Sequence, residues 1–333
     1  MLATKKKNNK VSPALVTKES RPRGNSNAGR LTRKSRGTSS GWLMVPGLVL
    51  LVGLIVVPLL IAVYSSLTSL DEYTIANWTG APFVGLANFR VALFNSSAVS
   101  GVSVAHSLLV SVEFSLVTTA FITPIGMAGA LVASVPSRLQ GVIRSVFLIP
   151  YAIPPFVTAI LWRFVFLNGG VLDRVLSDVH LGSINTFWLL GPNSFWALVI
   201  ADSWASWPFI FLLVLAGLQS IPGEVYDSAC IDGASAWFTF RSITLPFLKR
   251  LLLLALLLST INHLNNFALP YVMFGTPPPS NAEVLPLNVY VTSFSTFDFG
   301  VGAAMGLIGL VVLAVPGVLY IRATGLTRRG DLT

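Results

Sequence analysis

Six long apolar segments alternate with shorter polar stretches along this 333-residue chain. A helix needs about 20 apolar residues to cross a bilayer, and each segment reaches that length. The predicted spans cover residues 42–64, 104–134, 142–166, 195–218, 251–273 and 301–321. The pattern therefore predicts an all-α membrane protein with six transmembrane helices.

The basic residues that flank these segments predict the orientation of the chain, because cytoplasmic loops carry an excess of Lys and Arg. The loop between the fourth and fifth spans carries Arg241, Lys249 and Arg250, and the N-terminal tail and the C-terminus are also basic. Residues 274–300, between the last two spans, contain no Lys or Arg. We therefore expect both termini, and the loop between the fourth and fifth spans, to be cytoplasmic.

Composition agrees with a multi-pass membrane protein, since 53% of the residues are hydrophobic and only 11% are charged, against about a quarter charged in a soluble domain. The sequence predicts four parts. A basic, disordered cytoplasmic tail (1–40) precedes the first transmembrane helix and its outer loop (41–103). A transmembrane core follows (104–323), which contains a long cytoplasmic loop (221–248), and a short cytoplasmic C-terminus ends the chain (324–333).

The N-terminal tail concentrates the positive charge of the protein. Eleven of the 22 Lys and Arg residues lie in the first 36 positions. The tail can act as a solvated segment that keeps the N-terminus inside, or it can bind the anionic headgroups of membrane lipids. Its charged region is too long for a secretory signal. No aromatic residue is interleaved with the charges, so the pattern does not favour nucleic-acid binding.

The cytoplasmic loop has a composition that suits a protein partner better than a simple connection. It is neither short nor rich in Gly and Ser, and it mixes small residues with bulky ones such as Ile231, Trp237 and Phe238. Small residues let a partner backbone approach closely, and bulky apolar residues can fill a groove. Pro222 and Pro246 suit helix boundaries at the two ends of the segment.

Within this loop the sequence resembles the EAA motif of ATP-binding-cassette (ABC) importer permeases. That motif has Glu-Ala-Ala, three residues, Gly, nine residues and Ile-x-Leu-Pro. Here Asp replaces the Glu and Ser replaces the first Ala, while the spacing is kept. The resemblance implies that the loop docks on an ATPase subunit. The residues assigned to this coupling role are Glu224, Asp227, Ser228, Ala229, Asp232, Gly233, Ala234, Ile243, Leu245 and Pro246.

The resemblance extends over most of residues 42–322 and points to the sugar permeases of the maltose and glycerol-phosphate type. It is carried by VGLANF at 84–89, FLIPYAIP at 147–154 followed by Trp162, WASWPF at 204–209 and LAGLQSIP at 215–222, with NNF at 265–267 and FDFG at 297–300. The chain resembles the first of the two permeases that such systems usually encode.

This resemblance implies a type I ABC importer permease fold and a location in the bacterial inner or plasma membrane. It also implies the partners of such a subunit. These are a second homologous permease, a dimer of ABC ATPases, an extracytoplasmic solute-binding protein, a sugar substrate and membrane lipids.

No catalytic motif accompanies the transport features. The chain has no G-x-x-x-x-G-K-[ST] loop, no H-E-x-x-H pair and no G-x-S-x-G elbow, and it has one cysteine, Cys230. We therefore expect a subunit that is not an enzyme and carries no cofactor or metal of its own. ATP and magnesium are expected to bind to the partner ATPase.

Polar residues inside the spans are candidates for the substrate pathway, because burying them in a membrane is costly. Aromatic rings can stack on sugars, but they can also form an interfacial belt, and Asn side chains can line a path or bind across helices. An acid in the second span can line the cavity or pair with a neighbouring helix. A lone His263 suits hydrogen-bonded packing. The candidate pathway residues are Asp202, Trp204, Trp207, Asn262, Asn265, Asn266 and Glu113.

Two alternatives remain open from the sequence. An importer of the same architecture could carry a polyol, glycerol phosphate or a peptide instead of a sugar. A self-sufficient secondary transporter or a membrane receptor is the alternative from another class. A secondary carrier commonly shows inverted repeats and coupling-ion carboxylates near the midplane, and the sequence shows no clear repeat and few intramembrane acids.

Overall fold

The computed structural model describes residues 41–94, 101–180 and 186–324, and the side chains from residue 44 onward. The chain divides into two units, residues 1–50 and 51–333, and each is described by itself. The described part of the first unit lies in helix α1 (Gly41–Leu51). The second unit holds all the elements that build the candidate site. An antiparallel bridge pairs Thr68 with Phe83.

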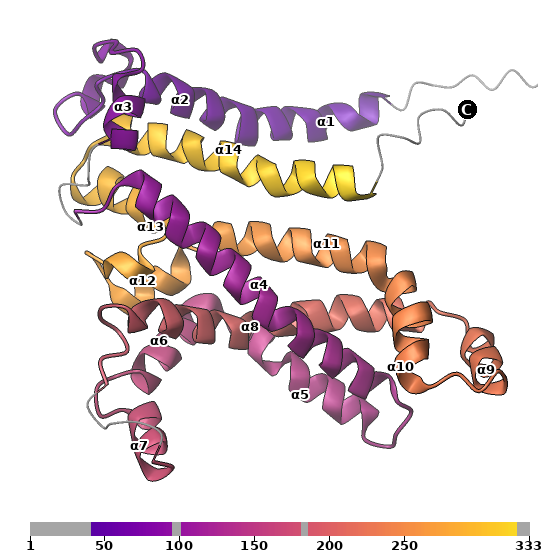
Figure 1. Cartoon of the computed structure of the whole chain (residues 1–333). Helices are drawn as coiled ribbons and strands as arrows, with labels where there is room; N and C mark the ends of the chain where they lie inside the picture. The colour runs from indigo at the N-terminus through magenta and orange to yellow at the C-terminus, as the bar shows by residue number, and fades with distance from the viewer. Residues whose placement is uncertain (1–40, 95–100, 181–185, 325–333) are drawn as a thin grey trace, which may run out of the picture. The chain divides into compact units, whose positions relative to one another are not determined.

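The second unit is almost entirely helical (Figure 1). In its first half the elements are η1 (Val52–Val56), α2 (Val57–Ser66), η2 (Ile75–Gly80), α3 (Ala87–Phe94), α4 (Val104–Ser134), α5 (Gln140–Ala152), α6 (Pro155–Val165) and α7 (Val171–Asp178). In its second half they are α8 (Asn193–Gln219), α9 (Gly223–Ile231), α10 (Ala236–Thr239), η3 (Phe240–Thr244), α11 (Leu245–Leu264), α12 (Ala268–Phe274), η4 (Ser280–Ala282), α13 (Leu285–Tyr290), η5 (Val291–Ser295) and α14 (Phe299–Thr324).

Five helical segments in the described part of the chain are long and apolar enough to cross a membrane, and α5 with α6 makes a sixth when that bent pair counts as one span. The predicted all-α fold is confirmed, and its six spans are found when α5 and α6 are counted together. The second predicted span, residues 104–134, coincides with α4, whose start is capped by the Ser103 side chain accepting from the N–H of His106.

The third span, predicted over residues 142–166, consists of two helices with a break between them. α5 and α6 meet at an angle of 89°. Ile153 and Pro154 between them have extended backbone angles. The two consecutive prolines explain the break, because each lacks an N–H donor and restricts the residue before it to extended conformations.

The fifth span is also interrupted. The predicted helix over residues 251–273 begins earlier, at Leu245, and ends at Leu264, and α12 starts only at Ala268. The amide of Asn265 donates to the carbonyl of Ile261 (3.1 Å), where it competes with the helical backbone. Asn266 therefore lies beyond the end of α11, and its spacing of four residues from Asn262 does not place the two on one helix face.

Helices α4, α8 and α11 pack together and position the site. α4 and α8 approach closely at Gly126, where a Cβ atom would lie 2.7 Å from the Cβ of Ile210 and 2.9 Å from the backbone nitrogen of Phe211. Small residues permit such close contact between membrane helices. α5 packs on the half of α8 that lies toward α10, and α6 and α12 pack against each other near its other half (Figure 1).

Candidate functional site

A cavity of about 890 Å³ opens where the third and fifth spans are broken. The α5–α6 bend, α8, the end of α11 and the start of α12 all contribute to it. Both interruptions leave backbone and side-chain polar groups at the cavity wall, where non-helical backbone is tolerated inside a membrane. The polar side chains of the lining are Tyr151, Thr158, Asp202, Ser206, Ser259, Asn262, His263, Asn265 and Asn266.

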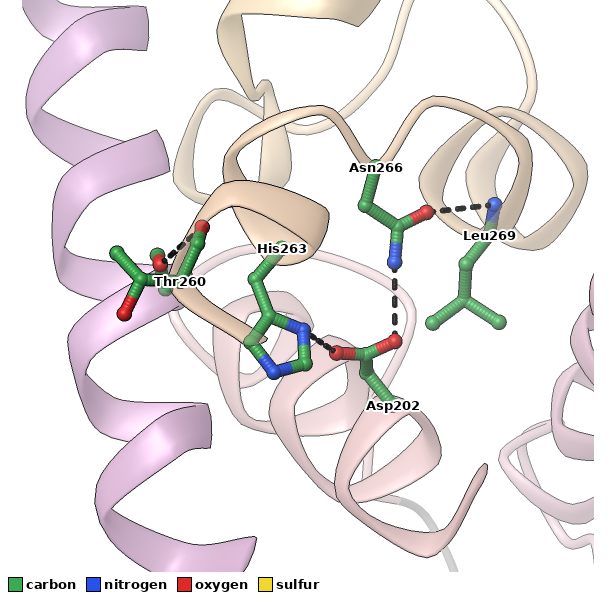
Figure 2. Close-up of polar contacts among 6 residues, drawn as sticks. Asp202, Thr260, His263, Asn266 and Leu269 are labelled. Atoms are coloured by element: carbon green, nitrogen blue, oxygen red, sulfur yellow. Dashed lines mark hydrogen bonds and ion pairs between the residues drawn. The ribbon is translucent and has the colours of Figure 1, made fainter. Parts of the chain in front are cut away.

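Three polar side chains connect α8 to the break that follows α11 (Figure 2). Nδ1 of His263 lies 2.6 Å from Oδ2 of Asp202. The amide nitrogen of Asn266 donates to Oδ1 of the same carboxylate at 2.9 Å. The amide oxygen of Asn266 accepts from the backbone N–H of Leu269 at 3.3 Å, in the first turn of α12. We call Asp202, His263 and Asn266 the α8–α11 triad.

Asp202 and His263 are buried and Asn266 is half-buried, and each oxygen of the carboxylate faces a nitrogen of this chain. Asp202 is 5% exposed and His263 is 1% exposed. The imidazole also packs edge-on against Phe114 of α4, with 6.0 Å between ring centroids. An intramembrane carboxylate held in this way fixes helices relative to one another. Asp202 therefore lies at the cavity wall but has little capacity left to bind a substrate directly.

Sequence reasoning placed His263 as a hydrogen-bonded packing residue outside the pathway, and the structure gives it the Asp202 partner as well as a place in the cavity lining. The sequence signal for a role at the site was a histidine within an apolar span, next to Asn262, Asn265 and Asn266. The sequence held no information on which acid it would meet, since Asp202 and His263 lie on different helices.

The other asparagines expose their amides to the cavity. Asn262 and Asn265 are exposed and line it. The side-chain amide of Asn262 makes no hydrogen bond with another residue in the described ranges, and it is therefore free to bind a ligand. Tyr151 and Phe209 add aromatic surface, with their rings stacked at 6.3 Å and 29°. Neither aromatic residue was predicted, although both lie within the stretches that carry the family resemblance.

The predicted tryptophans lie elsewhere. Trp204 packs edge-on against Trp162 at 5.9 Å, and Trp207 packs against Phe147 at 5.3 Å. Both are half-buried between helices and are not part of the cavity lining. Glu113 is exposed on α4 and is also outside that lining. The structure therefore brings together four of the seven candidate pathway residues.

The predicted coupling residues lie on α9, on the turn after it and at the start of α11, toward the end of the second unit that also holds the last turn of α14 (Figure 1). Glu224, Asp227 and Ser228 are exposed on α9, while Ala229 is buried. Ser228 donates its hydroxyl to the carbonyl of Glu224 at 2.8 Å. Asp227 thus projects from the surface of a short helix.

Gly233 ends α9 in a left-handed conformation (φ 72°). Its N–H donates to the carbonyl of Cys230 (3.1 Å), and the N–H of Ala234 donates to the carbonyl of Ala229 (2.9 Å). These two bonds form a Schellman C-cap, which needs a residue of positive φ at this position. The chain can then turn sharply at Asp232–Ala234 and enter α10.

A second set of contacts fixes the turn to the membrane core. The hydroxyls of Tyr226 and Thr244 lie 3.1 Å apart and join α9 to η3. η3 is a π-helical turn in which the N–H of Leu245 donates to the carbonyl of Phe240. Pro246 has no N–H for the helical bond at the next position, which favours this local rearrangement. Ile243, Leu245 and Pro246 thus mark the junction where α9 and α10 connect to α11.

The surface formed by α9 and α10 carries both exposed apolar side chains and exposed acids, the latter at Glu224, Asp227 and Asp232. Ile231 is 86% exposed, Trp237 68% and Phe238 58%. Exposed apolar side chains of this size mark interaction sites. Cys230, the single cysteine of the chain, is also exposed here. We call residues 224–238 the coupling surface.

Comparisons with known proteins agree with this architecture. Residues 122–327 match the family described as "Binding-protein-dependent transport system inner membrane component". The trehalose/maltose transport system permease protein MalF of Thermococcus litoralis is 34% identical over 87% of this chain and 95% of its own length. The sulfoquinovosyl glycerol transport system permease protein SmoG of Agrobacterium fabrum is 30% identical over 84% of this chain and 88% of its own length.

Solved structures show the same fold. A chain of a bacterial alginate ABC transporter, solved in complex with an alginate pentasaccharide-bound periplasmic protein, superposes with a TM-score of 0.71, covering 90% of this chain and 96% of that chain at 18% identity. The MetNI methionine ABC transporter, solved in inward-facing conformations, superposes with a TM-score of 0.53 over 66% of this chain and 94% of that chain, at 14% identity. The fold is that of a type I ABC importer permease, and the protein belongs to the family of binding-protein-dependent transport system inner membrane components.

Proposed function

We propose that this chain is the membrane permease of a sugar importer and forms half of the translocation pathway. A second permease completes the pathway, an extracytoplasmic solute-binding protein delivers the substrate, and an ABC ATPase dimer docks from the cytoplasm, partly on the coupling surface. The chain itself is not catalytic and holds no cofactor, because ATP and magnesium bind to the ATPase.

The side chains that line the cavity are the main reason for proposing a sugar as the substrate. Amide and hydroxyl groups of Asn262, Asn265, Ser206 and Ser259 surround a space bordered by the rings of Tyr151 and Phe209. Amides can donate to and accept from sugar hydroxyls, and aromatic faces suit the apolar faces of sugar rings. A volume of about 890 Å³ lies within the range of small-ligand pockets.

The same lining argues against glycerol phosphate as the substrate. Phosphate recognition relies on Arg or Lys, and the residues that line this cavity include neither. His263, the basic residue closest to that role, is held by Asp202. A neutral polyhydroxyl compound therefore fits better than an anion. The named relatives, a trehalose/maltose permease and a sulfoquinovosyl glycerol permease, support a carbohydrate or glycoside.

The experiment that tests this proposal is reconstitution of the permease with its second permease, ATPase and binding protein in liposomes. We expect ATP-dependent uptake of a neutral sugar that the binding protein recognises, and no uptake without the ATPase. ATP-dependent uptake of glycerol phosphate or a peptide in place of sugars would overturn the substrate assignment. Uptake by this chain without any ATPase would instead establish a secondary transporter.

Replacing Asn262 with alanine should weaken transport without unfolding the protein. The side-chain amide of Asn262 makes no hydrogen bond to another described residue, so its removal leaves no buried partner unpaired. The loss of about one hydrogen bond to the substrate predicts a roughly 3- to 10-fold higher KM for uptake. Asn193→Ala is the matched control, since Asn193 donates to the carbonyl of Phe187 in the outer loop and does not line the cavity. Equal KM values in both variants would contradict a substrate role for Asn262.

The coupling surface can be tested with the natural cysteine. Cys230 is exposed on α9 and is the single cysteine of the chain, so no cysteine needs to be introduced or removed. A maleimide reagent should label it in inside-out vesicles stripped of the ATPase. Rebinding of the ATPase should slow labelling by at least about tenfold, because a docked interface excludes solvent from its centre. An unchanged labelling rate in the assembled complex would show that the ATPase docks elsewhere.

A further inference from the structure

Three buried polar atoms near the α8–α11 triad have no hydrogen-bond partner among the residues that the structure describes. They are Nε2 of His263, the hydroxyl of Ser259 on α11 and the hydroxyl of Thr118 on α4. His263 is 1% exposed, Ser259 3% and Thr118 0%. Asp202 contacts the other ring nitrogen of His263, Nδ1 (Figure 2). A buried polar atom without a partner is costly, so each of these atoms requires an explanation.

The three atoms belong to one place between α4 and α11. The imidazole of His263 packs against Phe114 of α4. α4 and α11 are the second and fifth spans and run in opposite directions, so one turn forward on α4 and one turn back on α11 reach the same level. These positions are Thr118 and Ser259. We call the two hydroxyls and Nε2 of His263 the α4–α11 polar cluster.

Two neighbouring hydroxyls on α4 are satisfied by backbone groups instead. Thr123 donates to the carbonyl of Thr119 one turn back, at 2.6 Å. Ser115 donates to the carbonyl of Thr260 on α11 at 3.0 Å, which agrees with the antiparallel register of the two helices. Serine and threonine commonly make such bonds within helices. The hydroxyls of the α4–α11 polar cluster make neither kind of bond, so both remain available to a bound molecule.

The burial and the chemistry of the cluster identify its ligand. All three atoms are buried, so a substrate in the cavity does not contact them. Nε2 accepts a hydrogen bond when the imidazole is neutral and donates one when it is charged, while hydroxyls do both. Water fits either state, because it also donates and accepts. A metal ion fits poorly, because the described residues contain no group of three His, Cys, Asp or Glu side chains that could hold one.

We propose that the α4–α11 polar cluster binds one ordered water molecule. Buried waters typically make about three hydrogen bonds to otherwise unpaired polar groups, and the cluster supplies that number. Ser259 and His263 also line the cavity, which gives water a route to the site. The water joins α4 to the α8–α11 triad and so completes a polar network from α4 to the first turn of α12. This inference does not depend on the identity of the substrate.

In the first experiment the sign of the effect decides. Thr118→Val removes the hydroxyl and nearly keeps the shape of the side chain. If the hydroxyl binds water, the thermal unfolding midpoint of the purified complex should fall by about 1–3 °C, the effect of roughly one lost hydrogen bond. Ser259→Ala should add less in the double variant than alone, because both hydroxyls share one water. If the hydroxyl is unpaired, valine removes a costly buried group, and an unchanged or raised midpoint would overturn the proposal.

The second experiment locates the ligand directly, by cryo-electron microscopy of the assembled complex at a resolution that shows water. The expected density peak lies about 2.7–3.2 Å from Nε2 of His263 and from at least one of the two hydroxyls. The peak should weaken in Thr118→Val and persist in Thr123→Val, the control on the same helix, because the Thr123 hydroxyl bonds its own backbone. A wild-type complex without the peak would refute the site. A peak about 2.0–2.1 Å from Nε2 would show a metal ion and would also refute the proposal.

Discussion

Replacing Asp202 with alanine should lower the stability of the assembled permease by about 2–4 kcal/mol, the range expected when one partner of a buried polar pair is removed. The carboxylate is the common acceptor of the α8–α11 triad, so alanine leaves both His263 and the amide of Asn266 without their partner. His263 is 1% exposed, so its imidazole has little access to water that would replace the lost contact. The measurement is the thermal unfolding midpoint of the purified complex in detergent, which should fall by several degrees.

A double-mutant cycle separates the triad contact from general damage. Asp202→Ala and His263→Ala should each destabilise the complex, and the double variant should be little worse than either one, because the second change removes a group that is already unpaired. Ser206→Ala is a suitable control on α8, since Ser206 lines the cavity but takes no part in the triad. Additive effects of the two triad changes would show that the 2.6 Å contact contributes nothing to stability.

The triad should also set the shape of the cavity. Asn266 joins Asp202 on α8 to the first turn of α12, across the break in the fifth span. When the carboxylate is lost, the segment from Asn265 to Phe267 is no longer held to α8, and Asn265 and Phe267 both line the cavity. We therefore expect Asp202→Ala to impair uptake even at temperatures where the complex remains assembled.

The sequence predicted the helices well where hydropathy alone decides. α4 has the predicted bounds, and α8 and α14 begin and end within a few residues of theirs, because a long uninterrupted apolar run has only one stable form in a bilayer. The breaks after Ala152 and Leu264 were not predicted. Average hydropathy is unchanged when an apolar segment bends. The proline pair at Pro154 and Pro155 was a usable signal for the first break, but the second depends on side-chain bonds of Asn265 and Asn266 that only the fold reveals.

The candidate site was predicted in composition but not in arrangement. The asparagines of the fifth span do line the cavity, as polar residues in a membrane span should. The tryptophans do not, because Trp204 and Trp207 find aromatic partners between helices. Pairing across helices is a tertiary property, so the His263–Asp202 contact could not be read from one sequence.

For Gly233 the sequence identified the residue but not the reason why glycine is needed there. The sequence interpretation valued it as a small residue that lets a partner backbone approach. In the structure a Cβ at this position would meet no atom within 4 Å, so space within this chain does not require glycine. The requirement comes from the backbone, which is left-handed at this C-cap (φ 72°). A Gly just after a helix was the available signal.

Replacing Gly233 with valine should therefore reduce ATP-driven uptake by roughly tenfold or more. A left-handed conformation costs an L-residue about 1–2 kcal/mol, and a β-branched side chain is among the least tolerant. The Schellman bonds from Gly233 and Ala234 would be lost, and α9 would no longer present Asp227 in its present orientation. Uptake by the reconstituted complex and recovery of the ATPase with the tagged permease measure the effect.

Gly191 offers the matched control. It also has a positive φ (59°) and no atom within 4 Å of a built Cβ, but it lies in the loop before α8, far along the chain from the coupling surface. Gly191→Val should strain the backbone to a similar degree and leave ATPase recovery unchanged.

Asparagine at position 233 distinguishes the two explanations for the glycine. Asparagine tolerates the left-handed region but is much larger than glycine. If the backbone conformation is the reason, Gly233→Asn should retain most of the uptake that Gly233→Val loses. If instead the ATPase needs a bare backbone at this point, asparagine should fail as badly as valine. In that case the small-residue interpretation of the loop would hold, and the C-cap would be incidental to docking.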